Sequence, residues 1–274
     1  MIPLVVCDSG LGGLDVAAHF FSPNAGEKKW DIIYVNAYPS REWGYNDLPT
    51  LRAQEDLFQS VLEDMRQYSP AQCLIACNTL SIIWQRLSTR YKPPFPVTGI
   101  IDAAVNQMSE YMLSNPQSEL LLLGTKSTIE SGIYPKLLEQ RGISPERLHS
   151  MACPRLATLI EQGPKDSAVS TRISEYAIKA QAMFHCAPKR LALAFCCTHY
   201  GYATAYWRAA FQPLFGDINV LNPNDAMTLP GAGASFKYVT KTAMTESQQS
   251  AMAKWFDNSA YEIAEQLRLA PVIK

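Results

Sequence analysis

The sequence lacks a strong net charge and lacks an apolar run long enough to cross a membrane. Its 24 lysines and arginines nearly balance 25 aspartates and glutamates, and the formal charge is -1. This balance gives no electrostatic footprint for nucleic acid or for an anionic membrane surface, so small molecules are the expected partners. The uncharged stretch at residues 191–207 contains Thr198, His199 and Gly201, which argues against a membrane-spanning helix.

Cysteine patterns typical of disulfide frameworks or zinc sites are also missing. The seven cysteines are odd in number and are spread over 274 residues, unlike those of small secreted domains. No Cys-x-x-Cys pair or zinc-like Cys/His spacing occurs, so we expect no metal site. No basic segment precedes the short apolar run at residues 3–7, which predicts a first strand rather than a signal peptide. A cytoplasmic protein with reduced thiols fits these features.

The glycine-containing loop at residues 7–13 lacks the features of a nucleotide site. Asp15 stands where a dinucleotide fingerprint has its third glycine, and no Walker lysine follows. Asp8, at the end of the first predicted strand, has two possible roles. It could cap a helix, or it could act as a base beside a thiol in a dry cleft.

Short apolar runs alternate with helical stretches, and 47% of the residues are apolar. This alternation predicts one or two α/β domains in which parallel sheets are covered by helices. We expect strands at residues 3–7, 31–36, 73–77, 97–101, 119–124, 148–153, 189–196, 219–221 and 236–239. We expect helices at residues 50–68, 80–91, 102–113, 127–140, 167–185 and 245–258.

Two proline-containing segments indicate domain boundaries. Clustered prolines at residues 92–96 cannot extend a helix, and a second break is expected near Pro213. If the chain crosses twice, residues 1–97 and 213–274 form a first domain and residues 98–212 form a second. Ligands of open parallel sheets bind beyond the carboxyl ends of the strands, so we expect the active site in a cleft between the domains.

Two cysteine segments of similar design are the strongest functional signal. Cys77, in Ala76-Cys77-Asn78-Thr79, and Cys197, in Cys196-Cys197-Thr198-His199, each follow an apolar strand where a helix is expected to begin, near Thr79 and Tyr200. An isolated strand cysteine is more often a small buried hydrophobe. The similarity of the two segments favours a paired use of the thiols. The helix N-termini expected beside them suit a carboxylate ligand and lower a thiol pKa.

The remaining cysteines and histidines have less specific surroundings. His199 is either a structural histidine or a group that activates Cys197, because histidine exchanges protons near neutral pH. We interpret Cys196 as a packing residue, and the same holds for Cys7, Cys73 and Cys186; the alternative, redox coupling of the vicinal Cys196 and Cys197, would need an unusual local geometry. His19, His149 and His185 have no comparable neighbours.

Together, the ordered motifs resemble those of the cofactor-independent glutamate racemases, within the aspartate/glutamate racemase superfamily. The resemblance runs nearly end to end, and several motifs in order are more specific than any one. The matching segments are residues 8–13, 76–79 with 96–99, 124–128 with Ser131 and Tyr134, 152–154 leading to Glu161, 197–200, and the tail 236–240. The resemblance implies two pseudo-symmetric α/β domains with the substrate held between them and the chain's end returning to the first.

The resemblance also implies a role for each matching residue. Cys77 and Cys197 would be the two catalytic acid/bases, with Cys77 taking the proton of the D-enantiomer and Cys197 that of the L-enantiomer. Asp8 and His199 would poise Cys77 and Cys197, with Glu161 an additional partner near His199. The substrate-binding residues implied are Asp8, Ser9, Trp43, Gly44, Asn78, Thr79, Thr125, Thr128, Thr198 and His199. No pyridoxal or other cofactor is implied, and a homodimer is possible.

One segment departs from the family pattern. An Asp-Thr-Ala-Arg-like stretch followed by Pro-Tyr-Gly is replaced by residues 36–44, Asn-Ala-Tyr-Pro-Ser-Arg-Glu-Trp-Gly, in which Glu42 and Trp43 could alter the side chain that is accepted. The leading hypothesis is a racemase that supplies D-glutamate for peptidoglycan. The alternatives are a racemase of aspartate or another amino acid, and a non-catalytic ligand-binding protein on the same fold.

Overall fold

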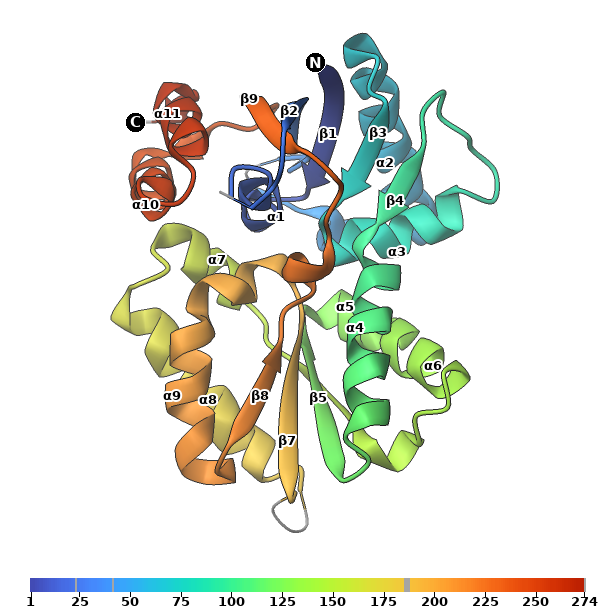
Figure 1. Ribbon diagram of the computed structural model, residues 1–274, viewed down its shortest axis with the longest axis vertical. Coiled ribbons are helices and arrows are strands. Elements are labelled where there is room, and N and C mark those ends of the chain that lie inside the picture. The colour runs from blue at the N-terminus through green and yellow to red at the C-terminus, as the bar shows by residue number, and fades with distance from the viewer. Residues whose placement is uncertain (23, 41, 185–187, 274) are drawn as a thin grey trace. The chain divides into compact units, whose positions relative to one another are not determined.

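The computed structural model describes residues 1–22, 24–40, 42–184 and 188–273 (Figure 1). It divides into two compact units: Met1–Ile100 with Met227–Lys274, and Ile101–Ala226. The sequence placed the return to the first unit near Pro213, but Pro213 lies inside helix α9 (Thr204–Phe215). The return comes later because the second unit still needs strand β8 (Ile218–Leu221) to complete its sheet.

The first unit contains a five-stranded sheet in the order β4-β3-β1-β2-β9, in which every pairing is parallel. Its strands are β1 (Ile2–Asp8), β2 (Lys28–Asn36), β3 (Gln72–Ile75), β4 (Val97–Gly99) and β9 (Ala232–Thr240). Its helices are α1 (Leu14–His19), α2 (Leu51–Met65), α3 (Asn78–Leu87), α10 (Glu246–Phe256) and α11 (Tyr261–Leu269), with short helices η1 (Tyr45–Asp47) and η2 (Arg66–Tyr68). A two-stranded pairing joins β10 (Met244–Thr245) to β11 (Val272–Ile273).

The second unit contains a four-stranded parallel sheet in the order β6-β5-β7-β8. Its other strands are β5 (Ser118–Gly124), β6 (Leu148–Ala152) and β7 (Arg190–Cys196). Its helices are α4 (Ile100–Ser114), α5 (Lys126–Glu130), α6 (Ile133–Gln140), α7 (Leu156–Gln162), α8 (Ser167–Gln181) and α9, with short helices η3 (Pro145–Arg147), η4 (Thr198–Ala203) and η5 (Pro223–Ala226). Helices α8 and α9 lie on one side of this sheet and α4 and α6 on the other (Figure 1).

The two sheets share one topology. Read from the other edge, the first four strands of the first unit lie in the order β2-β1-β3-β4, which is the order β6-β5-β7-β8 of the second unit. Each unit is therefore built as the same arrangement of strands and helices, and β9 extends only the first. This agrees with the pseudo-symmetric α/β fold expected from the sequence. It also makes the end of β3 equivalent to the end of β7.

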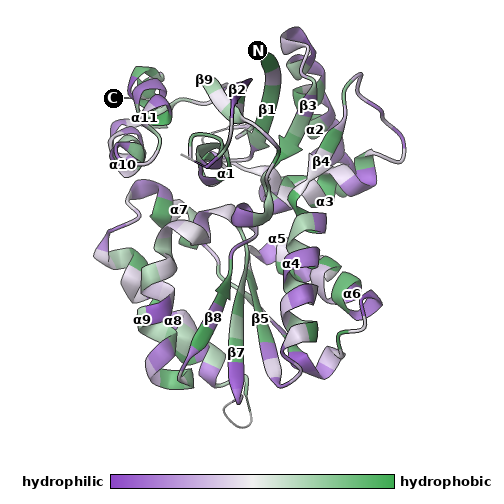
Figure 2. Cartoon of the chain, in the orientation of Figure 1, coloured by the Kyte–Doolittle hydropathy of each residue, from purple (hydrophilic) through white to green (hydrophobic). Residues whose placement is uncertain are grey.

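The central strands are apolar on both faces because helices cover both faces. In β1, Val5 and Cys7 face a buried cluster that contains residues of α2 and α3, such as Phe58 and Leu80. Successive side chains of a strand point to opposite faces, so Val6 lies on the other side of the sheet and is also fully buried. Figure 2 shows the same pattern as hydrophobic colouring along the strands and mixed colouring along the helices.

Local details differ from the sequence expectation in two places. The helix expected at residues 127–140 is split into α5 and α6, because Gly132 adopts a left-handed conformation with φ of 63°. The helix expected near Tyr200 is the 3₁₀ helix η4, and the α-helix α9 begins only at Thr204. His185 and Cys186, which the sequence analysis considered, lie outside the described residues.

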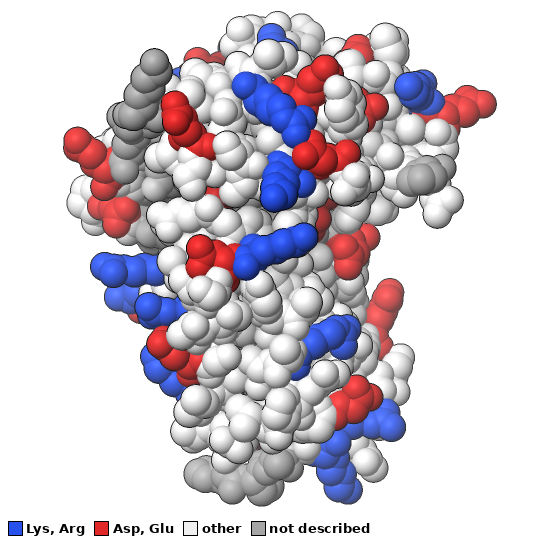
Figure 3. Space-filling view, turned by 90° about the vertical axis from the view of Figure 1, so that its left-hand side faces the viewer, with Lys and Arg blue, Asp and Glu red and all other residues white. Residues whose placement is uncertain are grey.

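The surface carries charges of both signs, as the balanced composition predicts. Figure 3 shows basic and acidic side chains interspersed over one face of the molecule. Within the described part of the chain, none of the helices combines the length and the apolar character needed to span a bilayer.

Candidate active site

Cys77 lies at the carboxyl edge of the first sheet. Strand β3 ends at Ile75, and Cys77 is the N-cap residue of α3, with its sulfur accepting a hydrogen bond from the backbone N–H of Leu80 at 3.4 Å. Strand β1 pairs with β3, so the loop that follows Asp8 lies beside this thiol. Ser9 Oγ lies 3.0 Å from Cys77 Sγ, in hydrogen-bond contact. The structure thus brings together a thiol and a hydroxyl that are far apart in the sequence.

The surroundings of Cys77 favour the protonated thiol. Burial raises the pKa of Cys77 to about 12, and the negative charge of Asp8 adds to the rise. The hydrogen bonds from Ser9 and from the Leu80 N–H act in the opposite direction, because they stabilise the thiolate. Cys77 therefore rests as a thiol and has two donors ready for the anion that forms when it gives up its proton.

Asp8 is buried beside Cys77, and its position requires a glycine nearby. A Cβ atom on Gly13 would lie 2.8 Å from both Asp8 Cβ and Ala76 Cβ, so only glycine allows α1 to start this close to the ends of β1 and β3. The N-cap residue of α1 is Gly13, so Asp8 does not cap that helix. Asp8 lies beside a thiol, where its charge raises the pKa of Cys77, and its role as a base stays a prediction.

The other residues predicted in the first unit fall into two groups. Asn78 and Thr79 are buried in the first turn of α3, directly after Cys77. Trp43 and Gly44 lie in the loop that follows β2, where Trp43 is 38% exposed and the Gly44 N–H donates to Asp47 Oδ2 at 2.7 Å. Asn78 and Thr79 thus lie next to the Cys77 thiol at the start of α3, whereas Trp43 belongs to a separate, more exposed loop.

Tyr45 is a residue that the sequence analysis missed. It belongs to the same buried cluster as Cys7 and Cys77, and its ring lies edge-on to that of Phe58, with centroids 6.4 Å apart. Burial raises the pKa of Tyr45 well above its usual range, and the nearby Cys7 and Cys77 add to the effect. The sequence signal that could have identified Tyr45 is its position directly after the divergent segment at residues 36–44.

In the second unit, Cys197 follows β7 and begins a chain of three polar groups. His199 Nδ1 lies 3.6 Å from Cys197 Sγ, and His199 Nε2 lies 2.7 Å from Oε1 of Glu161, which is on α7. Cys197 and His199 are both buried. A carboxylate, an imidazole and a thiol are thus aligned in one unit, and Glu161 lies next to His199, where the family resemblance implied it.

The charges and hydrogen bonds around His199 favour a charged imidazole ring. Burial alone would lower the pKa of His199, but its hydrogen bonds to Cys197 and Glu161 and the charges of those groups together raise it well above its usual range. A protonated ring donates one N–H to the carboxylate and the other to the sulfur. The second thiol is therefore held beside an imidazolium, a partner that stabilises a thiolate.

The threonines predicted as ligand-binding residues lie on the same edge of the second sheet. Strand β5 pairs with β7, with Gly124 opposite Cys196. Thr125 is the N-cap residue of α5, and its Oγ1 lies 3.0 Å from Oγ1 of Thr128. Thr198 is buried, and its carbonyl accepts a 2.9 Å hydrogen bond from Nδ2 of Asn224. Asn224, on η5, is a second residue that the sequence analysis did not identify.

Other thiols and histidines have structural surroundings. Cys7, Cys73 and Cys196 are fully buried, and burial raises the pKa of each thiol. The sequence had shown no neighbour of interest for His149, but its Nε2 lies 2.6 Å from Glu119 Oε2. Within residues 1–22, 24–40, 42–184 and 188–273, no cluster of three or more His, Cys, Asp or Glu side chains could hold a metal ion.

Comparison with known proteins connects this geometry to one family. A family model described as Asp/Glu/Hydantoin racemase matches residues 46–186. The chain is 29% identical over 195 residues to a glutamate racemase of Campylobacter jejuni, covering 71% of this chain and 72% of the relative. It is 26% identical over 264 residues to a glutamate racemase of Corynebacterium diphtheriae, covering 94% of this chain and 88% of the relative.

Solved structures show the same fold. A crystal structure of a glutamate racemase isoform from Bacillus anthracis superposes with a TM-score of 0.73, at 20% identity, over 94% of this chain and 95% of that one.

Proposed function

The chain belongs to the Asp/Glu/Hydantoin racemase family, and we propose that it interconverts L- and D-glutamate without a cofactor. The observation that carries the proposal is the pair of thiols at equivalent strand ends of two sheets with one topology. Cys77 rests as a thiol, and Cys197 lies beside an imidazolium. Inversion of a stereocentre by proton transfer needs this combination of one acid and one base.

In the proposed reaction, the two thiols act on opposite faces of the substrate's Cα. Cys197, as thiolate, takes the proton of the L-enantiomer, and Cys77 gives its proton to the other face to form the D-enantiomer. The reverse reaction exchanges the two roles. A free thiol has a pKa of about 8.5, so a cysteine can serve as acid or as base, depending on its surroundings in the protein.

The neighbours of each thiol make this exchange possible. His199, held by Glu161, stabilises the thiolate of Cys197 before the reaction and can retain its proton throughout. On the other side, Ser9 and the Leu80 N–H stabilise the Cys77 thiolate that remains after proton delivery. The Cα proton is weakly acidic, so donors near the substrate must also stabilise the negative charge that develops toward its carboxylate.

Hydroxyl and amide groups are the proposed ligands of the substrate. Asn78 and Thr79 in the first unit, and Thr125, Thr128 and Thr198 in the second, lie in the turns that follow the strands. N–H groups in the first turn of a helix favour a carboxylate. A cytoplasmic enzyme of this kind would supply D-glutamate for peptidoglycan.

The test is solvent exchange at Cα. With the purified chain in D₂O and no added cofactor, L-glutamate should lose its Cα proton signal in NMR and lose optical purity in a chiral assay. Cys77→Ser and Cys197→Ser should each abolish racemisation, because a serine hydroxyl is a far weaker acid than a thiol. Cys73→Ala, at a buried thiol on β3, the strand that precedes Cys77, is the matched control and should retain activity. Full activity in both serine variants would refute the mechanism.

A second candidate keeps the chemistry but changes the substrate to aspartate or another amino acid. The observation that favours it is the divergent loop at residues 36–44, in which Trp43 is 38% exposed. A chiral assay over a panel of amino acids separates the two, because clear turnover of another amino acid without turnover of glutamate would support the second. If no amino acid exchanges its Cα proton but one raises the melting temperature, binding without chemistry is the better account.

A further inference from the structure

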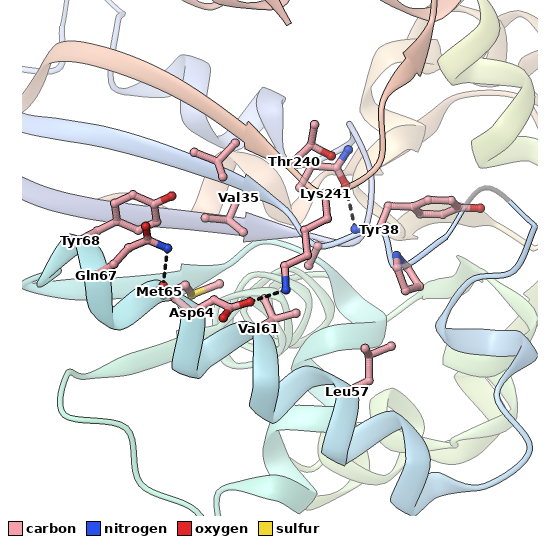
Figure 4. Close-up of a pocket in the computed structure, with 14 residues that line it drawn as sticks. Val35, Tyr38, Leu57, Val61, Asp64, Met65, Gln67, Tyr68, Thr240 and Lys241 are labelled. Carbon is pink, nitrogen blue, oxygen red and sulfur yellow. Dashed lines mark hydrogen bonds and ion pairs between the residues drawn. The ribbon is translucent and has the colours of Figure 1, made fainter. Parts of the chain in front are cut away.

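A pocket of about 270 Å³ lies within the first unit and is lined by none of the predicted active-site residues. It is bounded by α2 and by the carboxyl ends of β2 and β9 (Figure 4). Its inner surface is apolar, with Val35, Val61, Met65 and Val239 among the lining residues. The volume lies just below the roughly 300–1,000 Å³ typical of ligand pockets, so it suits a molecule smaller than a drug.

Two opposite charges stand at this apolar pocket, one on each wall. Lys241, just after β9, forms an ion pair with Asp64 on α2 (Figure 4). The two side chains are 69% and 51% exposed, so both remain accessible to a solute. An exposed pair of this kind contributes little to stability, so a ligand can separate it at small cost.

We propose that this pocket binds an α-amino acid with an apolar side chain, such as leucine or phenylalanine. The ligand's carboxylate pairs with Lys241, its ammonium group pairs with Asp64, and its side chain enters the apolar interior. Each protein charge exchanges its present partner for an equivalent one, so no charge is left unpaired. A simple anion would leave Asp64 without its cation, and a simple amine would leave Lys241 without its anion. The zwitterion is the class of ligand that satisfies both.

The side chain of the ligand supplies most of the affinity. Burying a leucine or phenylalanine side chain is favourable, whereas partly exposed ion pairs add only modestly. We therefore expect weak binding, in the millimolar range. Glutamate has the same backbone charges, but its second carboxylate would be buried against Val61 and Met65, so this pocket should reject it.

Occupancy of the pocket would also affect the loop that follows β2. Tyr38 lines the pocket, its N–H donates to Asn36 Oδ1 at 3.0 Å, and its carbonyl accepts from Thr242 Oγ1 at 2.9 Å. A bound ligand would pack against this hydrogen-bonded segment, which continues to Trp43 and Gly44. A change in the KM for glutamate is the expected consequence, and this consequence alone rests on the proposed function.

Binding can be tested without any activity. In protein labelled with ¹³C at its methionine methyl groups, Met65 reports on the pocket, and the Met65→Leu variant assigns its signal. Addition of L-leucine or L-phenylalanine should shift the Met65 signal in a saturable way, also in the presence of saturating glutamate. L-Alanine, 4-methylpentanoate and 3-methylbutylamine are the comparison ligands, which lack the apolar body, the ammonium group and the carboxylate respectively.

Variants at the two charges give the decisive comparison. Lys241→Met and Asp64→Asn should each weaken leucine binding by about fivefold, as expected for one partly exposed charge pair. Lys28→Met and Glu63→Gln remove charges from β2 and α2, outside the pocket lining, and should leave binding unchanged. A melting temperature close to that of the wild type will show that each variant is folded.

Three outcomes would overturn the proposal. The first is no shift of Met65 up to the solubility limit of either amino acid. The second is equal binding of leucine and its singly charged analogues, or no effect of the variants at Lys241 and Asp64. The third is a Met65 signal that shifts with protein concentration instead of with ligand, which would mean that a second copy of the chain covers the pocket.

Discussion

Glu161 Oε1 lies 2.7 Å from Nε2 of His199, and the opposite nitrogen of the same ring lies 3.6 Å from the sulfur of Cys197. The carboxylate fixes the orientation of the ring and favours its protonated form. Glu161 therefore acts on the thiol through His199 and is a positioning residue in the proposed reaction. The same two contacts explain why a buried histidine carries a charge here.

Replacing Glu161 with glutamine should lower the pKa of His199, because the change removes the negative charge that stabilises the imidazolium. We expect the NMR titration midpoint of His199 to fall, and kcat/KM for racemisation to fall roughly tenfold, equivalent to about 1.4 kcal/mol. The loss should be equal in both directions, since the equilibrium constant of racemisation is one. Glu119→Gln is the matched control, because Glu119 pairs with His149 elsewhere in the same unit. An unchanged His199 titration in Glu161→Gln would contradict this role.

The stability of the chain should depend on pH through His199. Its pKa is raised in the folded state, so the folded protein binds this proton more tightly than the unfolded chain does. The resulting stabilisation is fully present below the unfolded pKa of about 6.5 and is lost as the pH rises through the folded pKa. Urea unfolding of the wild type and of His199→Gln should show a stability difference that shrinks from acid to alkaline pH. A difference that stays constant across this range would rule out the linkage.

Replacing Ser9 with alanine should make the Cys77 thiolate harder to form. The Ser9 hydroxyl lies 3.0 Å from the sulfur and partly offsets the burial that raises the pKa of Cys77 to about 12. Without it, that pKa should rise further, and both racemisation and alkylation of Cys77 by iodoacetamide should slow by roughly tenfold, as for the loss of about 1.4 kcal/mol. Mass spectrometry of the Cys77 peptide at several pH values measures the alkylation.

The control for this change is Ser60→Ala, on the exposed surface of α2, where the hydroxyl donates to a backbone carbonyl of its own helix. It should leave alkylation of Cys77 and racemisation at wild-type rates. Equal alkylation rates in Ser9→Ala and the wild type would show that the contact does not tune the thiol.

Replacing Gly13 with alanine should destabilise the first unit. The new Cβ would lie 2.8 Å from Asp8 Cβ and from Ala76 Cβ, so α1 would have to move away from the strand ends. Overpacking of this kind costs about 1–3 kcal/mol, which a lowered urea midpoint will report. In Gly163→Ala the nearest atom is Asp166 Cβ at 3.6 Å, so this control should change stability little. Equal midpoints for the two variants would show that the close approach at Gly13 is not needed.

Strand positions were predictable because continuous apolar runs have few alternatives in a helix-covered sheet. The run at residues 119–124 became β5, and the run at residues 189–196 became β7. Helix boundaries that depend on a single residue were harder to predict from the sequence. Gly132 divides a helical pattern by its left-handed conformation, and Pro213, where the sequence predicts a break, lies inside α9. The residue type alone therefore did not decide, at either position, whether a helix ended there.

The order of residues along the chain was sufficient to establish which chemical groups stand at each strand end. A thiol follows each of two apolar strands, polar residues stand directly behind each thiol, and enough motifs occur in order to indicate the family. These features are local, since a strand, the turn after it and the first turn of the next helix are contiguous in the chain. The position of each thiol directly after a strand could therefore be predicted from the sequence alone, and its catalytic role stays a prediction.

The groups that act on each thiol depend instead on how the chain folds. Ser9 meets Cys77 across 68 residues, and Glu161 meets His199 across 38 residues, because the strand order brings those loops to a common edge. Tyr45 entered the buried cluster of Cys77 for the same reason. The strength of a thiol as acid or base depends on burial and on neighbouring charge, and both are properties of the packed chain and not of the motif that carries the sulfur.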